Sequence, residues 1–325
     1  MLQSTQAQSP GPWAIVIFAS RESVGVLLQA VQAAGVAGRG RAQIDVLVNG
    51  NPGLAAEFAA RMAGAPPVAG GPAVNIWSIA QGDKANAWNQ YIHRIWAGQA
   101  LSFFIDGYVR LNPDAVALLG DALVANPSLL GGTGMPSTGR TAAAAREKMA
   151  EQGGFHGNFC CITGPTIAQL RQRHIALPLG LYRVDSLMGA LLSFNLNPAN
   201  NDWNHRRILV HPTASWQTEA KHWWRPADLK ARFKRTLRQA KGLLENEAVK
   251  QFLEREQLPP ETLPTTASAL VNQWLQHHPV QARRFMRQHP LTFFALKDIS
   301  KPIDWSDATR APTLAWSGRS AKGVV

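Results

Sequence analysis

The chain has 325 residues, of which 46% are hydrophobic and 17% are charged. This composition excludes a disordered protein and is typical of a globular chain that buries a full core, as one large domain or as one domain with an appendage. The net charge of +12 is unevenly placed, because residues 1–200 carry +3 and residues 201–325 carry +9. A basic C-terminal third can attract nucleic acid, anionic lipid or an acidic polymer, and charge alone does not choose among them.

We expect neither a disulfide framework nor a membrane-spanning segment. The two cysteines, Cys160 and Cys161, are adjacent in the sequence, so a bridge between them would be strained. Residues 1–12 are polar and lack a basic n-region, and the apolar run from Trp13 to Ala19 is too short to cross a membrane. We therefore expect a flexible N-terminus, residues 1–12, on a cytoplasmic protein.

Apolar runs alternate with helical patterns along the first part of the chain. Strands are expected at 13–19, 44–48, 74–79 and 100–105, and helices at 24–34, 54–62, 85–96 and 113–125. The run at 13–19 is continuously apolar, as in a parallel strand that is buried on both faces. The alternation predicts the α/β class, with a mostly parallel sheet flanked by helices on both faces.

The pattern loosens after residue 130. The Gly/Thr/Ala-rich stretch 131–145 is expected to be a flexible loop, followed by a strand within 154–164 and by helices at 167–173 and 185–193. From Pro226 onward the sequence looks helical and includes a basic segment at 229–244. We therefore expect a main α/β domain at 13–225 and a helical, basic C-terminal extension at 226–325.

Polar residues follow each expected strand directly. Four such sets are present: Ser20 to Glu22, Asn49 to Asn51, Gln81 to Lys84, and Asp106 to Tyr108. Ligands of an open parallel sheet bind beyond the carboxyl ends of its strands. The sequence therefore predicts that these four sets line one crevice.

Two segments resemble those of a known family. Residues Gly82 to Asn89 are similar to a G-x-x-x-A-x-N segment that opens a helix, and Phe103 to Asp114 stands where an apolar strand runs into an acidic D-x-D and a proline. Both segments resemble those of glycosyltransferase family 2, which has the Rossmann-like GT-A fold. The resemblance covers residues 13 to about 215. It implies an inverting glycosyltransferase of the hexosyltransferase type, with a nucleotide sugar, by family analogy a UDP-sugar, as donor.

The resemblance also implies which residues form the site. The donor would be bound by Ala19, Ser20, Glu22, Asn49, Lys84, Asn89, Asp106 and Gly107. In the segment Leu181 to Met188, Asp185 stands where the family has its catalytic base, although Val184 replaces the usual first acid. His156 or Asn158 would touch a hydroxyl group of the donor sugar or acceptor.

A divalent cation is the cofactor that the resemblance implies. Asp106 matches the first acid of the D-x-D and would bind Mn²⁺ or Mg²⁺, and His211 is a further candidate ligand. Tyr108 replaces the second acid, and a tyrosine is a poor ligand for a hard cation. Three alternatives follow: the metal is held more weakly, other residues complete its ligands, or basic groups such as Lys84 or Arg110 replace it.

Each candidate also has a purely structural alternative. Asp185 could cap the helix that follows it, Glu22 and Ser20 could cap the first helix, and Asn49 and Asn51 suit a tight turn whatever it binds. Asp106 could serve only in a turn, and Lys84 could be a solvated lysine at the start of a helix.

The expected partners follow from the family resemblance and from the charge of the C-terminal third. The acceptor would be a glycan or a lipid-linked hydroxyl, as in polysaccharide biosynthesis. The basic segment 229–244 could be a solvated face, a helix on an anionic membrane surface, which would make the protein peripheral, or a contact for phosphate or acidic glycan. A catalytically inactive relative that only binds a nucleotide sugar is the alternative function. No nucleic-acid motif is present, so we do not expect nucleic acid as a partner.

Overall fold

The structure is a computed structural model that describes residues 12–64, 71–139, 142–218 and 226–318, without the side chains of 226–235. The expected flexible N-terminus therefore lies outside the described residues, except for Pro12. The strands are β1 (Trp13–Ala19), β2 (Ala42–Asn49), β3 (Val74–Ile79), β4 (Leu101–Asp106), β5 (Arg110–Leu111), β6 (Gly131–Pro136), β7 (Phe159–Thr163), β8 (Ile208–Gln217) and β9 (Thr313–Gly318). The α-helices are α1 (Val24–Gly38), α2 (Pro52–Ala63), α3 (Lys84–Gln90), α4 (Ala115–Val124), α5 (Ala142–Gln152), α6 (Gly164–Gln172), α7 (Val184–Ser193), α8 (Pro226–Lys250), α9 (Ala267–His277), α10 (Pro279–Gln288) and α11 (Leu291–Ile299).

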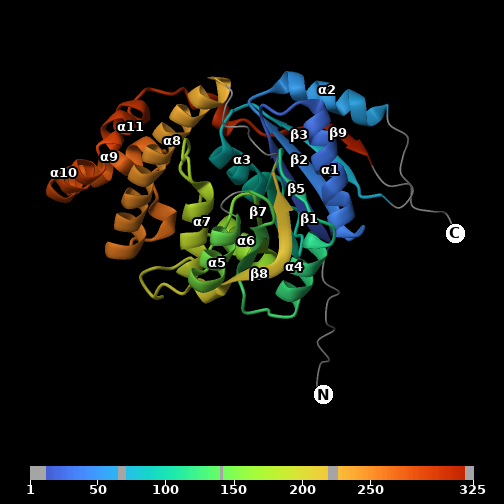
Figure 1. The fold of residues 1–325 in the computed structure, drawn as a ribbon, viewed down its shortest axis with the longest axis horizontal. Coiled ribbons are helices and arrows are strands. Elements are labelled where there is room, and N and C mark those ends of the chain that lie inside the picture. Colours follow the sequence, from blue (N-terminus) through green and yellow to red (C-terminus); the bar gives the residue numbers. More distant parts are fainter. Residues whose placement is uncertain (1–11, 65–70, 140–141, 219–225, 319–325) are drawn as a thin grey trace, which may run out of the picture.

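Within the described residues, nine strands form one sheet in the order β5-β8-β6-β7-β4-β1-β2-β3-β9 (Figure 1). The block β3-β2-β1-β4 is parallel throughout, and all of β1 is buried, as its continuous apolar sequence predicts. Antiparallel strands β9 and β7 flank this block. The α/β class with helices on the sheet is thus confirmed.

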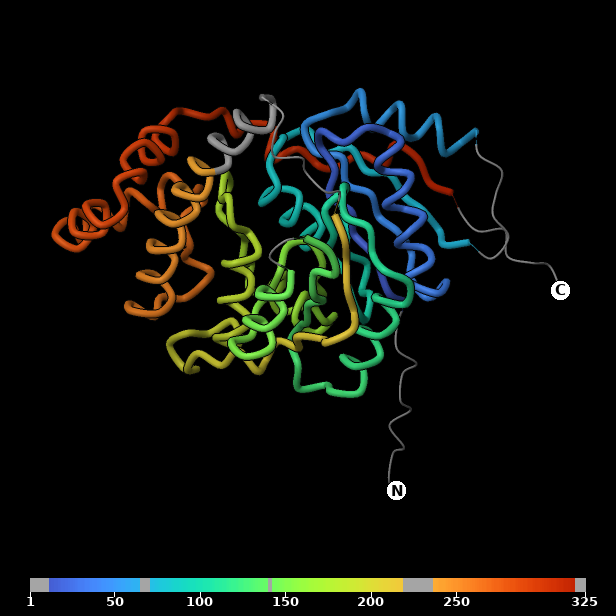
Figure 2. The backbone as a smooth tube through the Cα atoms, viewed as in Figure 1, coloured from blue at the N-terminus to red at the C-terminus, as the bar shows by residue number. Residues whose placement is uncertain are grey.

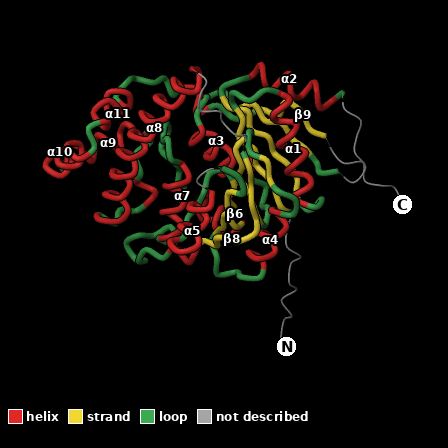
Figure 3. Tube along the Cα trace, viewed as in Figure 1, coloured by secondary structure: helices red, strands yellow, loops and turns green. Residues whose placement is uncertain are grey.

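Helices cover both faces of the sheet (Figure 3). The buried side chains between them and the sheet form two hydrophobic cores. One core joins the sheet to α1, α2 and α4 through side chains such as Leu27, Phe58 and Leu119. The other joins the opposite face to α3 and α7, where Trp88 stacks on Phe104 with ring centroids 3.9 Å apart. The strands therefore run between two packed cores.

The C-terminal extension is helical from α8 to α11, and the tube in Figure 2 shows it beside the sheet domain rather than wrapped around it. Its buried residues Leu244 and Phe252 belong to the same core as Trp88. After α11 the chain returns to the sheet and adds β9 antiparallel to β3, a strand that the sequence pattern did not predict.

The expectation of a flexible loop at 131–145 is wrong. Residues 131–136 form the buried strand β6, and α5 begins at Ala142, while residues 140–141 lie outside the description. The glycines serve close packing: a Cβ on Gly131 would lie 2.5 Å from the carbonyl oxygen of Cys161, and one on Gly134 would lie 2.4 Å from a ring carbon of Phe159. The glycines of this stretch therefore permit close packing of a strand and do not indicate a flexible backbone.

Candidate functional site

The carboxyl ends of β1, β2 and β4 meet at one edge of the sheet. The register pairs Ala19 with Val48 and Phe18 with Asp106, so the residues that follow these strands are neighbours. Asn49 fastens two of the strand ends, because its side-chain Nδ2 donates to the carbonyl oxygen of Ala19 at 2.8 Å. The structure therefore brings Ala19, Asn49 and Asp106 together, as the order of the strands predicts.

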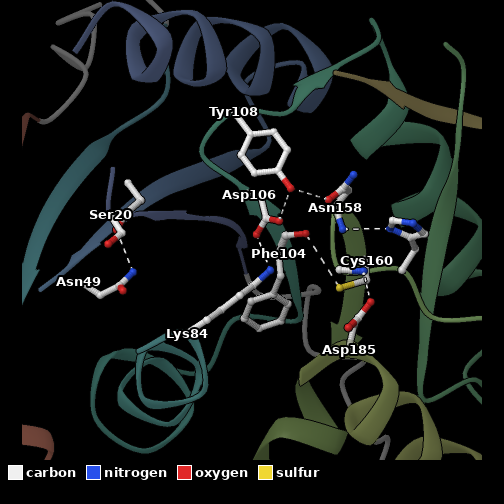
Figure 4. Close-up of polar contacts among 12 residues, drawn as sticks. Ser20, Asn49, Lys84, Phe104, Asp106, Tyr108, Asn158, Cys160 and Asp185 are labelled. Atoms are coloured by element: carbon white, nitrogen blue, oxygen red, sulfur yellow. Dashed lines mark hydrogen bonds and ion pairs between the residues drawn. The ribbon is translucent and has the colours of Figure 1, made fainter. Parts of the chain in front are cut away.

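Asp106 is engaged by two side chains at the end of β4 (Figure 4). The ammonium of Lys84, the first residue of α3, forms an ion pair with Asp106 Oδ1. The hydroxyl of Tyr108 donates to Asp106 Oδ2 at 3.0 Å. Tyr108 thus stands at the second acidic position of the D-x-D motif and donates its hydroxyl proton to the first acid, Asp106.

The surroundings of Lys84 and Tyr108, which both contact Asp106, favour a charged lysine and a neutral tyrosine. Burial by itself lowers the pKa of Lys84, but the Asp106 carboxylate, and next the Asp185 carboxylate, raise it above its usual value. Burial, followed by the charge of Asp106, raises the pKa of the Tyr108 hydroxyl far above its usual value. The site therefore carries a fixed cation beside one carboxylate.

Gly107 permits the loops after β1 and β4 to touch. Its backbone N–H donates to the carbonyl oxygen of Phe18 at 2.7 Å, and a Cβ at this position would lie 2.9 Å from the same oxygen and 3.3 Å from Glu22 Cδ. Glu22 in turn accepts backbone N–H groups from Ser20 at 2.7 Å and Arg21 at 2.9 Å. Ser20 and Glu22 are thus placed beside the end of β4.

Asp185 lies in the first turn of α7, on the other side of the site. Its Oδ2 accepts the backbone N–H of Gly157 at 3.1 Å, and the structure assigns no side-chain cap to the α7 N-terminus. A Cβ on Gly157 would lie 3.2 Å from Asp185, so this glycine allows the carboxylate to approach the backbone. The side chain of Asp185 therefore binds the Gly157 backbone and does not cap α7, as the structural alternative had it.

Asn158 links the two sides. Its Oδ1 lies 3.3 Å from the Tyr108 hydroxyl, and its backbone N–H donates to His156 Nδ1 at 3.2 Å (Figure 4). The His156 ring lies against Trp216 with centroids 4.9 Å apart, and burial lowers the pKa of His156. Burial therefore favours a neutral His156, although the charges of Asp185 and Asp106 oppose this effect on its pKa.

Two predicted residues have other contacts. Asn89 donates through Nδ2 to the carbonyl oxygen of Leu177 and accepts the Leu177 N–H through Oδ1, both at 2.8 Å, so both ends of its amide are engaged with backbone. His211 lies on β8 and its Nδ1 accepts the backbone N–H of Ala214 at 3.0 Å. Neither contact joins these residues to Asp106.

The residues around Asp106 do not make a set of metal ligands. Both carboxylate oxygens of Asp106 are engaged, one of them by an ammonium that would repel a cation. Across the described ranges, no group of three His, Cys, Asp or Glu side chains could hold a metal ion. The chemistry of these side chains therefore does not fit a divalent cation held by the protein alone.

Two contacts of the site were not predicted from the sequence, although one of the residues, Asp83, lies in the polar set Gln81 to Lys84. Asp83 caps α3 by accepting the Asn86 N–H at 2.8 Å and also accepts the Gly180 N–H at 3.1 Å. Thr133 accepts the His156 N–H at 3.2 Å, from within the strand that was expected to be a loop. An aspartate directly before a helical pattern was a readable capping signal, whereas the tertiary contact of Thr133 had none.

No protein-family model matches the chain, and no curated protein sequence matches it either. Among solved structures, the chain is similar to the mannosyltransferase PcManGT from Pyrobaculum calidifontis, which was solved in complex with GDP-Man and Mn²⁺. The TM-score is 0.53 at 13% sequence identity, and the match covers 90% of this chain and 85% of that one. The chain therefore shares a Rossmann-like α/β fold with this mannosyltransferase.

Proposed function

We propose that the protein is an inverting glycosyltransferase that moves a sugar from a nucleotide sugar, UDP-linked by family analogy, to a hydroxyl group. The observation that carries this proposal is the pairing of a cation with Asp106 at the strand ends and a second carboxylate, Asp185, across the site. The Tyr108 hydroxyl donates to Asp106 and lies 3.3 Å from Asn158 Oδ1, and Gly157, next to Asn158, donates its N–H to Asp185. Ala19, Ser20, Glu22, Asn49 and Gly107 lie at the donor side of this arrangement.

The chemistry assigns one role to each side. Asp185 takes the proton of the acceptor hydroxyl while its oxygen bonds to the anomeric carbon. The bond from that carbon to the diphosphate oxygen breaks, and the nucleoside diphosphate leaves with the electron pair. A fixed positive group stabilises this developing charge, and Lys84 is the cation present at the site. His156 and Asn158 are placed to contact the sugar or the acceptor.

The proposal assigns the diphosphate charge to Lys84 rather than to a protein-held metal. A bound metal would supply the same charge stabilisation, and Asp106 is the side chain at the strand ends that would contact it. The mannosyltransferase neighbour binds Mn²⁺ with its donor, so the metal is one arm of the test. A donor that binds equally well in EDTA supports Lys84 as the cation.

The test is a thermal-shift panel of nucleoside diphosphates and nucleotide sugars, each with EDTA, Mn²⁺ or Mg²⁺, because a ligand of the folded state raises the melting temperature. We expect a selective shift that disappears in Asp106→Ala and Lys84→Met. Asp185→Asn should keep this shift and lower transfer by a factor on the order of 10² to 10⁴. The absence of a shift with every nucleotide would refute a donor site, and a shift only with metal would refute the role given to Lys84.

A nucleotide-sugar-binding protein without activity is the second candidate, and Tyr108 at the second acidic position is the observation that favours it. This candidate predicts the same thermal shift with no turnover of any donor, either by transfer or by hydrolysis. Asp185→Asn would then change nothing that is measured. Donor hydrolysis in the absence of acceptor distinguishes the two candidates, because it needs no knowledge of the acceptor.

The acceptor proposed is a glycan or a lipid-linked hydroxyl, as in polysaccharide biosynthesis, and the location proposed is the cytoplasm or the inner face of its membrane. In the part of the chain that the structure describes, no helix is long and apolar enough to span a bilayer. The basic segment 229–244 lies on α8, but the side chains of 226–235 are outside the description. Membrane contact through that segment stays a prediction.

A further inference from the structure

Large apolar side chains are exposed in one short region of the C-terminal extension. Between residues 280 and 303, Val280 is 77% exposed, Leu291 42%, Phe293 52%, Phe294 66% and Ile303 51%. The helices that carry most of them, α10 and α11, lie at the far end of the extension from the sheet (Figure 1). Isolated exposed apolar residues are ordinary, but several within two consecutive helices mark an interaction surface.

The packing of these helices does not need the exposed residues. α10 buries Ala282 and Met286, and α11 buries Thr292, Ala295 and Ile299, which recur at helical spacing on one side. Phe293 and Phe294 follow the first buried position of α11 and are left in solvent. The two aromatic rings are therefore available to a partner without any change in the fold.

Cations accompany these apolar residues. Val280, Arg283, Arg284 and Arg287 recur at i, i+3, i+4 and i+7, which places them on one exposed stripe of α10. Residues 279–303 contain five Lys and Arg but a single acid, Asp298, which pairs with Lys301 at 2.7 Å. Among the described residues no carboxylate forms an ion pair with the three arginines.

We propose that the exposed face of α10 and α11, the tip surface, docks on an anionic phospholipid bilayer. Phenylalanine and leucine side chains enter the boundary between headgroups and acyl chains, and arginines pair with lipid phosphates, so this combination of side chains matches both layers of the bilayer surface. The proposal differs from the contact predicted for residues 229–244 and does not depend on transferase activity. Docking here would hold the catalytic domain beside acceptors carried by lipid.

The test is co-sedimentation of the full-length chain with vesicles of phosphatidylglycerol and phosphatidylcholine in equal parts, compared with phosphatidylcholine alone. We expect binding only to the anionic vesicles, weakened by added salt. The variant Arg283→Gln/Arg284→Gln/Arg287→Gln should lose about fivefold in affinity per arginine, or roughly a hundredfold in total, since each cation near such a surface contributes about 1 kcal/mol. Phe293→Ser/Phe294→Ser should also weaken binding, at unchanged net charge.

Matched controls remove the same kinds of side chain elsewhere. Arg61→Gln/Arg206→Gln/Lys250→Gln removes three exposed cations, and Leu118→Ser/Val124→Ser removes two exposed apolar residues from α4. Equal losses in control and tip variants would overturn the proposal, because binding would then follow net charge or general hydrophobicity. A dimer in the absence of vesicles that Phe293→Ser/Phe294→Ser abolishes would also overturn it and assign the surface to a second copy. Circular dichroism and urea denaturation verify that each variant folds.

Discussion

Glu245 on α8 is a buried acid whose replacement should change how stability depends on pH. Its side chain is fully buried, its Oε2 accepts the Tyr182 N–H at 2.9 Å, and its Oε1 lies 3.7 Å from Lys241 Nζ. Burial raises the pKa of Glu245 to about 7, against 4.5 ordinarily, and the nearby Lys241 only partly offsets this. The folded chain therefore keeps a proton that the unfolded chain releases.

The sign and size follow from proton linkage. Between pH 4.5 and pH 7 the folded state binds more protons at Glu245 than the unfolded state, so the free energy of unfolding falls as the pH rises through this window. The contribution is fully present below pH 4.5 and lost above pH 7. At about 1.4 kcal/mol for each tenfold change in proton affinity, it amounts to roughly 3 kcal/mol.

Glu245→Gln replaces the titrating group by an isostere of its protonated form. Near pH 4 we expect little change in the free energy of unfolding, and near pH 8 we expect the variant to gain roughly 3 kcal/mol relative to the original chain. Urea denaturation followed by tryptophan fluorescence at several pH values measures this difference. Glu57→Gln, at an exposed position on α2, is the control. A stability difference between Glu245→Gln and the original chain that is constant across the pH range would refute the reasoning.

Two further substitutions and one titration test individual contacts. Gly50→Ala places a Cβ 2.3 Å from Gly82 Cα at a φ of +66°, so the urea midpoint should fall by the equivalent of about 2 kcal/mol or more, and an unchanged midpoint would contradict this close approach. The His156 ring should titrate below pH 6.5 in an NMR experiment, because burial lowers its pKa, and a midpoint at or above that value would show an open, solvated ring. Asn89→Ala removes both hydrogen bonds to Leu177 and should cost about 1 to 3 kcal/mol of stability while keeping the donor thermal shift, whereas loss of that shift would return Asn89 to the donor site.

The sequence predicts the sheet well where burial determines the pattern. Residues 13–19 are apolar without interruption because β1 lies between two parallel strands and under helices on both faces. The strand-end rule then places Ala19, Asn49 and Asp106 at one edge, which the register confirms. These features are local in sequence, or depend only on the parallel order of the strands.

Contacts between distant segments could not be predicted in this way. The glycines of β6 fit a crowded strand, but in sequence they cannot be distinguished from loop glycines, since only the facing Cys161 and Phe159 make the difference. Asn89 matches a family motif, yet it binds the backbone of Leu177, which is 88 residues away. Its function as a donor ligand stays a prediction, as do the functions of Asp106, Lys84 and Asp185.

The segment from Leu177 to Arg183 shows why the extension belongs to the framework of the site. On one side, Asp83, which directly precedes Lys84 at the start of α3, accepts the backbone N–H of Gly180 at 3.1 Å. On the other side, Lys241 of α8 donates to the Gly180 carbonyl oxygen at 3.0 Å. Arg183 donates to Gln239 of α8 at 2.6 Å, and a Cβ on Gly242 would lie 2.5 Å from the Arg183 side chain. The segment leads directly into α7 and Asp185. The position of Asp185, the proposed base, therefore depends on α8, the first helix of the extension.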